Sequence, residues 1–277
     1  EMTSSLVGSE MCIRDRIKGG IRMKKFLSVA LCALLCIGAA ALPVGFSACG
    51  NANVLVIGYT KYEPMNYFEN GILTGHDTEL ATMVLHDELG YDIEFQEIKW
   101  DAKIIELNSG RIDLIWNGMT ITDELKEAIL ITDPYMVNKQ VLVTRAEDAG
   151  NYTAIADLAK ADSIVYESGS AADTLISELN LTGVDLKGAE SQAKALMEVG
   201  AGTSDVAVID VTMAMSMTGE GTDYAGLTYK DIGFAEEQYG VGLRKSDTEL
   251  CKKINEVFAE FEENGTMDAL YQKYMVK

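Results

Sequence analysis

Residues 107–136 read LNSGRIDLIWNGMTITDELKEAILITDPYM, and this stretch decides the fold. Residues 107–110 are typical of a helix that ends at a glycine. The short apolar run at 112–116 suits a parallel strand that is covered on both faces. Small polar residues follow at 117–122, and in open α/β sheets ligands bind just beyond the carboxyl ends of strands. The stretch therefore predicts half of a ligand site, and the other half must come from later in the chain.

The flanking sequence predicts two α/β units. Strands at 54–58 and 91–98 and helices at 77–89 and 100–107 precede the opening stretch, which gives a β-α-β-α-β order and a parallel sheet. An extended run at 140–144 is a candidate crossing strand, and a return crossing is expected at 232–234. Strands at 163–166 and 206–209 and helices at 171–179, 191–199 and 211–217 lie between them. Two units joined by two extended crossings predict a hinged two-lobe protein with a cleft between the lobes.

Composition excludes some classes of function. The chain has 277 residues, 48% of them hydrophobic, and a formal net charge of −20, which suits one large or two ordinary domains with proper cores. Residues 49–277 alone carry 17 basic and 40 acidic side chains. A nucleic-acid partner is excluded on this basis, because neutralising phosphates needs a basic face.

The N-terminal segment predicts export. Residues 1–22 resemble translated sequencing adapter, and we treat them as a probable non-native extension. Residues 23–48 have the basic start and apolar run of a lipoprotein signal peptide, and Phe46-Ser47-Ala48-Cys49 resembles a lipobox that would be lipidated at Cys49. Residues 49–53 then form a short linker. The alternative is an uncleaved transmembrane helix, since 26–48 is long enough to span a bilayer. Both alternatives place the part of the chain that follows residue 48 outside the cytoplasm.

Several short motifs carry a family resemblance, and their order and spacing matter more than any one of them. They are YEPM (62–65), GHDTEL (75–80), LNSGRID (107–113), NGMTIT (117–122), DPY (133–135), SGSA (168–171), VID (208–210), YGVGLR (239–244) and NG (264–265). Over about residues 54–277 the chain resembles the family 3 extracellular solute-binding proteins, the lipoproteins that serve ABC transporters of polar amino acids.

The resemblance implies a fold and a function. The fold would be α/β, of the two-lobe type II periplasmic-binding-protein kind. Each lobe would hold a mostly parallel sheet flanked by helices, with residues 54–142 plus 237–277 in lobe 1 and 143–236 in lobe 2. The chain would be a monomer that captures an amino acid or amine for an ABC permease. It would be anchored by lipid at the extracellular face of the membrane, or in the periplasm of a Gram-negative source, with no cofactor and no metal.

The resemblance also implies site residues. Asn117, Gly118 and Thr120 would surround the α-carboxylate and α-amino groups of the ligand. Ser170 would donate to the carboxylate from the second lobe, and Asp210 would accept from the ammonium. Tyr59 or Tyr62 would cover the side chain. Further candidates are Glu63, Trp100, Trp116 and Lys126. Each has an alternative structural role, such as a helix cap for Asp210 and Ser170, turn formation for Asn117 and Thr120, or packing for the aromatic residues.

Leu125 departs from the family pattern, which usually has an arginine there to clamp the carboxylate. Losing a charge-assisted hydrogen bond of about 1.5–3 kcal/mol weakens that grip roughly tenfold to a hundredfold. Three outcomes remain open. The ligand is bound more weakly, Lys61 or Lys126 substitutes for the arginine, or the ligand is not an α-amino acid. Asp210, Glu63 and the uncharged Leu125 together favour a cationic or amine-bearing ligand.

Two other functions compete with solute binding. One is an enzyme on the same fold, either cyclohexadienyl dehydratase-like or peptidoglycan-cleaving. The sequence shows no Ser-His-Asp or Cys-His arrangement, phosphate-binding glycine loop or metal cluster, so we predict no enzymatic activity. The other is a ligand-sensing receptor domain, which would need a further signalling segment beyond Lys277.

Overall fold

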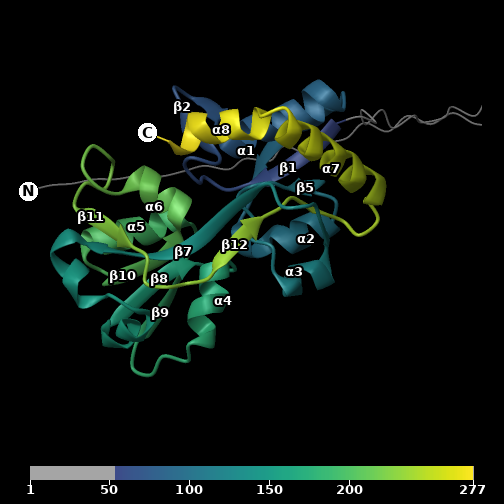
Figure 1. Ribbon diagram of the computed structural model, residues 1–277. Coiled ribbons are helices and arrows are strands. Elements are labelled where there is room, and N and C mark those ends of the chain that lie inside the picture. Colours follow the sequence, from purple (N-terminus) through teal and green to yellow (C-terminus); the bar gives the residue numbers. More distant parts are fainter. Residues whose placement is uncertain (1–53, 277) are drawn as a thin grey trace, which may run out of the picture. The chain divides into compact units, whose positions relative to one another are not determined.

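The structure is a computed structural model that describes residues 54–276 (Figure 1). The predicted extension at 1–22, the signal peptide at 23–48, the linker at 49–53 and Cys49 lie outside the described residues. Among the helices of residues 54–276, none combines the length and the apolar character needed to cross a bilayer.

The first sheet contains the strand of the opening stretch. Its strand order is β4 (Asp92–Glu97), β1 (Val54–Tyr59), β5 (Leu114–Ile115), β13 (Gly242–Leu243) and β6 (Leu130–Ile131). β1 pairs in parallel with both β4 and β5, which confirms the predicted β-α-β-α-β unit. β13 returns from the far end of the chain and pairs antiparallel with β5 and β6.

The apolar run at 112–116 is buried because helices cover both faces of this sheet. Leu114 and Trp116 pack into a core beneath α7 (Thr248–Glu263) and α8 (Thr266–Met275). Ile112 and Ile115 pack on the opposite face, in a core that includes residues of α2 (Lys103–Asn108). All four side chains are fully buried, which explains why the strand carries no polar alternation.

The second sheet has the order β11 (Leu227–Lys230), β7 (Met136–Arg145), β10 (Val206–Asp210), β8 (Ser163–Glu167) and β9 (Asp185–Ala189). β8 pairs in parallel with β9 and β10, whereas β7 runs antiparallel to β10 and β11. The α/β fold class is therefore confirmed. In each sheet one of these strands, β13 in the first and β7 in the second, runs against the others.

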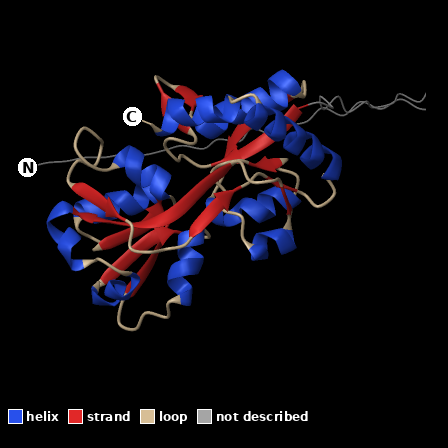
Figure 2. Cartoon of the chain, viewed as in Figure 1, coloured by secondary structure: helices blue, strands red, loops and turns tan. Residues whose placement is uncertain are grey.

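The strand β7 links the two sheets (Figure 2). Residues 136–139 pair with β12 (Glu236–Tyr239), and residues 140–145 pair with β10 and β11. β12 in turn leads from the second sheet back to β13 in the first. β7 and β12 are thus the two crossing strands. Below, lobe 1 denotes the first sheet with its helices and lobe 2 the second; the exact lobe boundaries stay a prediction.

The remaining elements cover the sheets or connect them. A hairpin of β2 (Tyr67–Glu69) and β3 (Ile72–Thr74) lies near the start of lobe 1. The other helices are α1 (His76–Ala81) with its π-helical continuation Thr82–Glu88, the 3₁₀ turn Trp100–Ala102, α3 (Asp123–Ala128), the 3₁₀ turns Ala146–Asn151 and Ile155–Lys160, α4 (Ala171–Glu178), α5 (Gln192–Ala201) and α6 (Val211–Met217).

Candidate functional site

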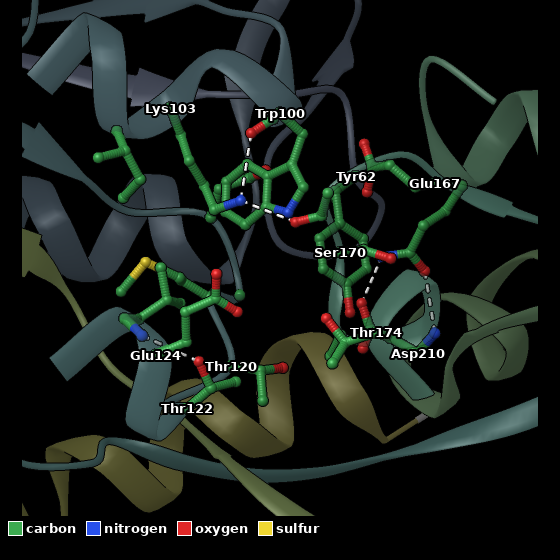
Figure 3. Close-up of a pocket in the computed structure, with 18 residues that line it drawn as sticks. Tyr62, Trp100, Lys103, Thr120, Thr122, Glu124, Glu167, Ser170, Thr174 and Asp210 are labelled. Atoms are coloured by element: carbon green, nitrogen blue, oxygen red, sulfur yellow. Dashed lines mark hydrogen bonds between the residues drawn. The ribbon is translucent and has the colours of Figure 1, made fainter. Parts of the chain in front are cut away.

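A cavity of about 240 Å³ lies between the lobes, where strands of both sheets end (Figure 3). Lobe 1 lines it with the turn after β5 and the start of the helical segment at residue 100, and lobe 2 with the turn after β8 and the end of β10. The lining residues are Tyr62, Trp100, Lys103, Ile104, Asn117, Gly118, Met119, Thr120, Thr122, Glu124, Leu125, Glu167, Gly169, Ser170, Ala171, Thr174, Gln192 and Asp210. The polar turn after β5 was predicted to form half of a ligand site, with Ser170 and Asp210 in the other half. The structure places these two halves around the same cavity.

The structure brings most of the predicted site residues to this cavity. Those that line it are Tyr62, Trp100, Asn117, Gly118, Thr120, Ser170 and Asp210. The other four predicted residues do not line it. Tyr59 packs edge-on against Phe95, and Trp116 is buried in the lobe 1 core. Glu63 accepts a hydrogen bond from Ser216, and Lys126 points to solvent and pairs with Asp123.

The polar groups of Asn117 and Gly118 are already occupied. The Asn117 amide donates to the Thr60 carbonyl and to Asn66 Oδ1, and its oxygen accepts from the Thr60 N–H and hydroxyl. The Gly118 N–H donates to Asp77 Oδ2 at 2.6 Å. Gly118 has a φ of 57°, and a Cβ there would lie 2.6 Å from Tyr62 Cε1. These two residues therefore form the wall of the cavity and offer it few free donors.

Asp210 is held by amide side chains. It is 6% exposed, and its Oδ1 accepts from Asn138 and Gln140 at 2.7 and 2.6 Å, while its Oδ2 accepts from Gln192. A hydrogen bond with the Tyr62 hydroxyl also lowers the pKa of this carboxyl, so polar side chains from both lobes surround Asp210. Asp210 stands at the N-cap position of α6, but its side chain makes no capping hydrogen bond to that helix. The amides, and not the cap, therefore orient the carboxylate.

The same two amides connect Asp210 to a second acid, Glu237. Asn138 and Gln140 also donate to Glu237 Oε1, at 2.6 and 2.7 Å, and Thr120 adds a third bond at 3.0 Å. The register explains this cluster, since Asn138 lies opposite Glu237 and Gln140 opposite Asp210. Burial raises the pKa of both carboxyls, and the nearby charge of Asp210 helps to raise that of Glu237 to about 7.

Lys103 is a site residue that sequence reasoning missed. Its side chain is buried, and Nζ donates to the carbonyls of Trp100 and Gly169 at 3.3 and 2.8 Å and lies 4.7 Å from the centre of the Trp100 ring. Burial lowers the pKa of Lys103 to about 8. A signal was present: Lys103 shares the apolar helical stripe of Trp100 and Leu107, where a charged residue is unusual.

Glu167 and Gln192 were also missed. Glu167 ends β8 and is 4% exposed, and burial followed by the charge of Asp210 raises its pKa to about 8. A charged residue at the end of an all-buried strand, next to a Ser-Gly-Ser turn, was the available signal. The sequence around Gln192 gives no comparable signal, because its role depends on a tertiary contact with Asp210.

Hydroxyl groups join the lobes beside the cavity. The Tyr62 hydroxyl hydrogen-bonds to Thr212 of lobe 2, and it lies 2.7 Å from the Tyr239 hydroxyl on crossing strand β12. Ser170 caps α4 by accepting from the Asp173 N–H at 3.3 Å, so its capping role is present while the residue lines the cavity. Within residues 54–276 no three His, Cys, Asp or Glu side chains are grouped to hold a metal ion.

Comparison with known proteins identifies the family. Residues 55–277 match the model of the bacterial extracellular solute-binding proteins, family 3. The chain belongs to this family. This confirms the predicted family, the fold class and the function as a solute-binding protein.

Relatives of this family 3 solute-binding protein are amino-acid-binding proteins. It is 28% identical to the L-cystine-binding protein TcyJ of Escherichia coli over 77% of this chain and 79% of that one. It is also 28% identical to the arginine-binding extracellular protein ArtP of Bacillus subtilis, over 87% and 96%. Among solved structures, an ancestral amino-acid-binding protein described as a precursor of cyclohexadienyl dehydratase matches with a TM-score of 0.73 and 31% identity, over 80% and 96% of the two chains.

Proposed function

We propose that this protein captures an amino acid, or a closely related small polar solute, in the cavity between its lobes and delivers it to the permease of an ABC importer. The observation that carries the proposal is one cavity that presents a buried carboxylate, Asp210, together with a buried ammonium, Lys103. A zwitterionic solute supplies the complementary charges, and buried charges need such pairing. The family and the binding proteins among the relatives support the same conclusion.

Asp210 accepts a hydrogen bond from the ammonium group of the solute in this proposal. The three amide donors fix the orientation of its carboxylate, and the ammonium of the solute would add a charged donor to them. The neighbouring acid Glu237 adds negative charge from behind the cavity wall. A cation bound here therefore relieves the electrostatic repulsion between the buried Asp210 and the half-buried Glu237.

Lys103 takes the role of the missing arginine at Leu125. An ammonium has three donors, and two of them are used by backbone carbonyls, which leaves one for a carboxylate of the solute. Ser170 is the second donor proposed for that carboxylate. Tyr62 and Trp100 provide the aromatic walls, and Asn117, Gly118 and Thr120 shape the remaining surface.

A thermal-shift screen tests the proposed function. Each of the twenty amino acids, together with simple amines and dicarboxylates, is added to the protein, and a solute at about 100 times its Kd raises the free energy of unfolding by about 2.7 kcal/mol. Asp210→Asn should abolish the shift, while Asp223→Asn, an exposed loop acid, should retain it. A protein that responds to no amino acid would contradict the proposal.

We also propose that the solute is bound without chemical change. The named relatives bind amino acids, although one structural neighbour is a precursor of a dehydratase. The bound solute should be recovered unaltered by mass spectrometry after prolonged incubation. Turnover of a prephenate-like acid would instead support the dehydratase alternative.

Anchoring and assembly are separate proposals. The lipobox-like sequence supports lipidation of Cys49 and attachment to the outer face of the membrane, and we expect a monomer. In cells, Cys49→Ser should abolish incorporation of an alkyne-tagged fatty acid and release the protein from the membrane fraction. A wild-type protein that incorporates no label would exclude the anchor, and light scattering measures the oligomeric state.

A further inference from the structure

The cavity contains more buried acid than a neutral amino acid can balance. Of the described residues that line it, Lys103 is the sole cation, whereas Glu124, Glu167 and Asp210 are acidic. Glu124 is exposed at the rim, but Glu167 and Asp210 are 4% and 6% exposed. The single ammonium of a neutral amino acid can partner only one of these two buried carboxyl groups.

Glu167 carries the open acceptor. Its Oε1 is buried and has no hydrogen-bond partner among residues 54–276, whereas the Asp210 carboxylate already accepts from three amides. The structure describes no ion pair to Glu167 within that part of the chain either. A buried carboxyl oxygen left without a partner is costly, and a donor on the bound solute would remove that cost.

The surroundings of Glu167 do not supply that donor. Lys103 faces it from α2, but the Lys103 ammonium is directed to two backbone carbonyls. Asp210 from β10 and Asp101 from the 3₁₀ turn at Trp100–Ala102 add negative charge, and the Gln192 amide from α5 lowers the pKa of Glu167 only in part. The labelled side chains in Figure 3 show Glu167 on the same side of the cavity as Asp210 and Ser170.

We propose that Glu167 binds a second positively charged group of the solute, so that the cavity selects dibasic amino acids over neutral ones of the same shape. This inference rests on the proposed function, in which Asp210 takes the first ammonium and Lys103 the carboxylate. A solute with two cationic groups and one carboxylate gives a counter-charge to Asp210, Glu167 and Lys103 alike. Glu167 is then the residue that determines specificity.

Isosteric ligand pairs test this inference. Calorimetry on the full chain compares L-lysine with L-norleucine and L-arginine with L-citrulline, which differ by a positive charge at nearly constant shape. The charged member of at least one pair should bind tighter by roughly tenfold to a hundredfold, as expected for a charge-assisted hydrogen bond. Glu167→Gln should bring that ratio to about threefold or less, mostly by weakening the charged ligand.

The control is Glu178→Gln, which removes one exposed acid from the end of α4 in the same lobe and should keep the ratio of the wild type. A wild type that binds norleucine or citrulline as tightly as the charged partner would overturn the inference and leave the proposed function intact. So would a Glu167→Gln variant with an unchanged ratio. Failure of every amino acid to bind would overturn both.

Discussion

Lys103 of lobe 1 donates a hydrogen bond from Nζ to the carbonyl oxygen of Gly169 in lobe 2, at 2.8 Å. Both residues line the cavity, so this bond joins the two lobes beside it and places a buried ammonium where the lobes meet. Gly169 can approach so closely because it has no side chain, since a Cβ there would lie 2.9 Å from the Asp101 Cα. One side chain thus contributes both to the contact between the lobes and to the charge of the site.

Replacing Lys103 should weaken both contributions. Lys103→Met removes the cross-lobe bond and the proposed partner of the carboxylate, so the Kd for the identified solute should rise roughly tenfold to a hundredfold, as measured by calorimetry. The exposed neighbour Lys99 provides the control, and Lys99→Met should change the Kd by less than about threefold. An equal loss in both variants would mean that general charge, and not the cavity cation, controls affinity.

Restoring an arginine at position 125 should tighten binding. Leu125 lines the cavity in the first turn of α3, where its N–H donates to Thr122 Oγ1 at 3.1 Å. In Leu125→Arg a bidentate guanidinium reaches into the cavity, and affinity for a solute with an α-carboxylate should improve by roughly tenfold or more. Lys126→Arg, on the exposed side of α3, is the control. Unchanged or weaker binding by Leu125→Arg would count against a carboxylate near this wall.

Gly118→Ala should destabilise the fold near the cavity. The position has φ 57°, and the added methyl group would collide with the Tyr62 ring. A non-glycine residue in this region costs about 1–3 kcal/mol, so the midpoint of urea unfolding should fall. Gly150→Ala, at a site with nothing within 4 Å of the new Cβ, should leave that midpoint nearly unchanged. Equal midpoints for the two variants would show that the wall at Gly118 adapts freely.

Stability of the solute-free protein should fall as pH rises from about 5 to 8. Burial raises the pKa of Glu167 to about 8 and that of Glu237 to about 7. Between the ordinary and the raised pKa values, the folded state therefore keeps protons that the unfolded chain has lost. The contribution of these carboxyls to the free energy of unfolding is complete below the ordinary carboxyl pKa, and it is lost as the pH passes the raised values. Thermal unfolding should show a smaller decline for Glu167→Gln than for the wild type, while Glu178→Gln keeps the wild-type slope. Parallel slopes for all three proteins would contradict a raised pKa at Glu167.

The sequence predicts the fold better than it predicts the site. Apolar periodicity and strand-end chemistry are local, so the strands at 54–58, 112–116 and 206–209 and the polar turn after residue 116 could be found from short windows. The mixed direction of the sheets could not, because it depends on where β7 and β13 insert.

Most of the differences between the predicted and the observed site arise from contacts between residues that are distant in the sequence. Asn117 has the residue type of a ligand donor, but its four hydrogen-bonding positions are taken by Thr60 and Asn66, which only the folded chain brings near. Trp116 has the type of a pocket aromatic, but it lies on the core face of its strand. Lys103 lies in a predicted helix and Glu167 directly follows a predicted strand. Their part in the cavity could not be predicted, because it depends on how the two lobes face each other.

The amides of Asn138 and Gln140 join Asp210 to Glu237 across β7, β10 and β12. β7 and β12 are also the strands that must bend if the lobes are to separate. A positive charge delivered to Asp210 of β10 reduces its repulsion with Glu237 of β12, whereas its departure restores that repulsion. We therefore expect the charge of the bound solute to affect how firmly β12 is held beside β7 and β10. A substitution of Asn138 or Gln140 should then change both the affinity for the solute and the freedom of these crossing strands.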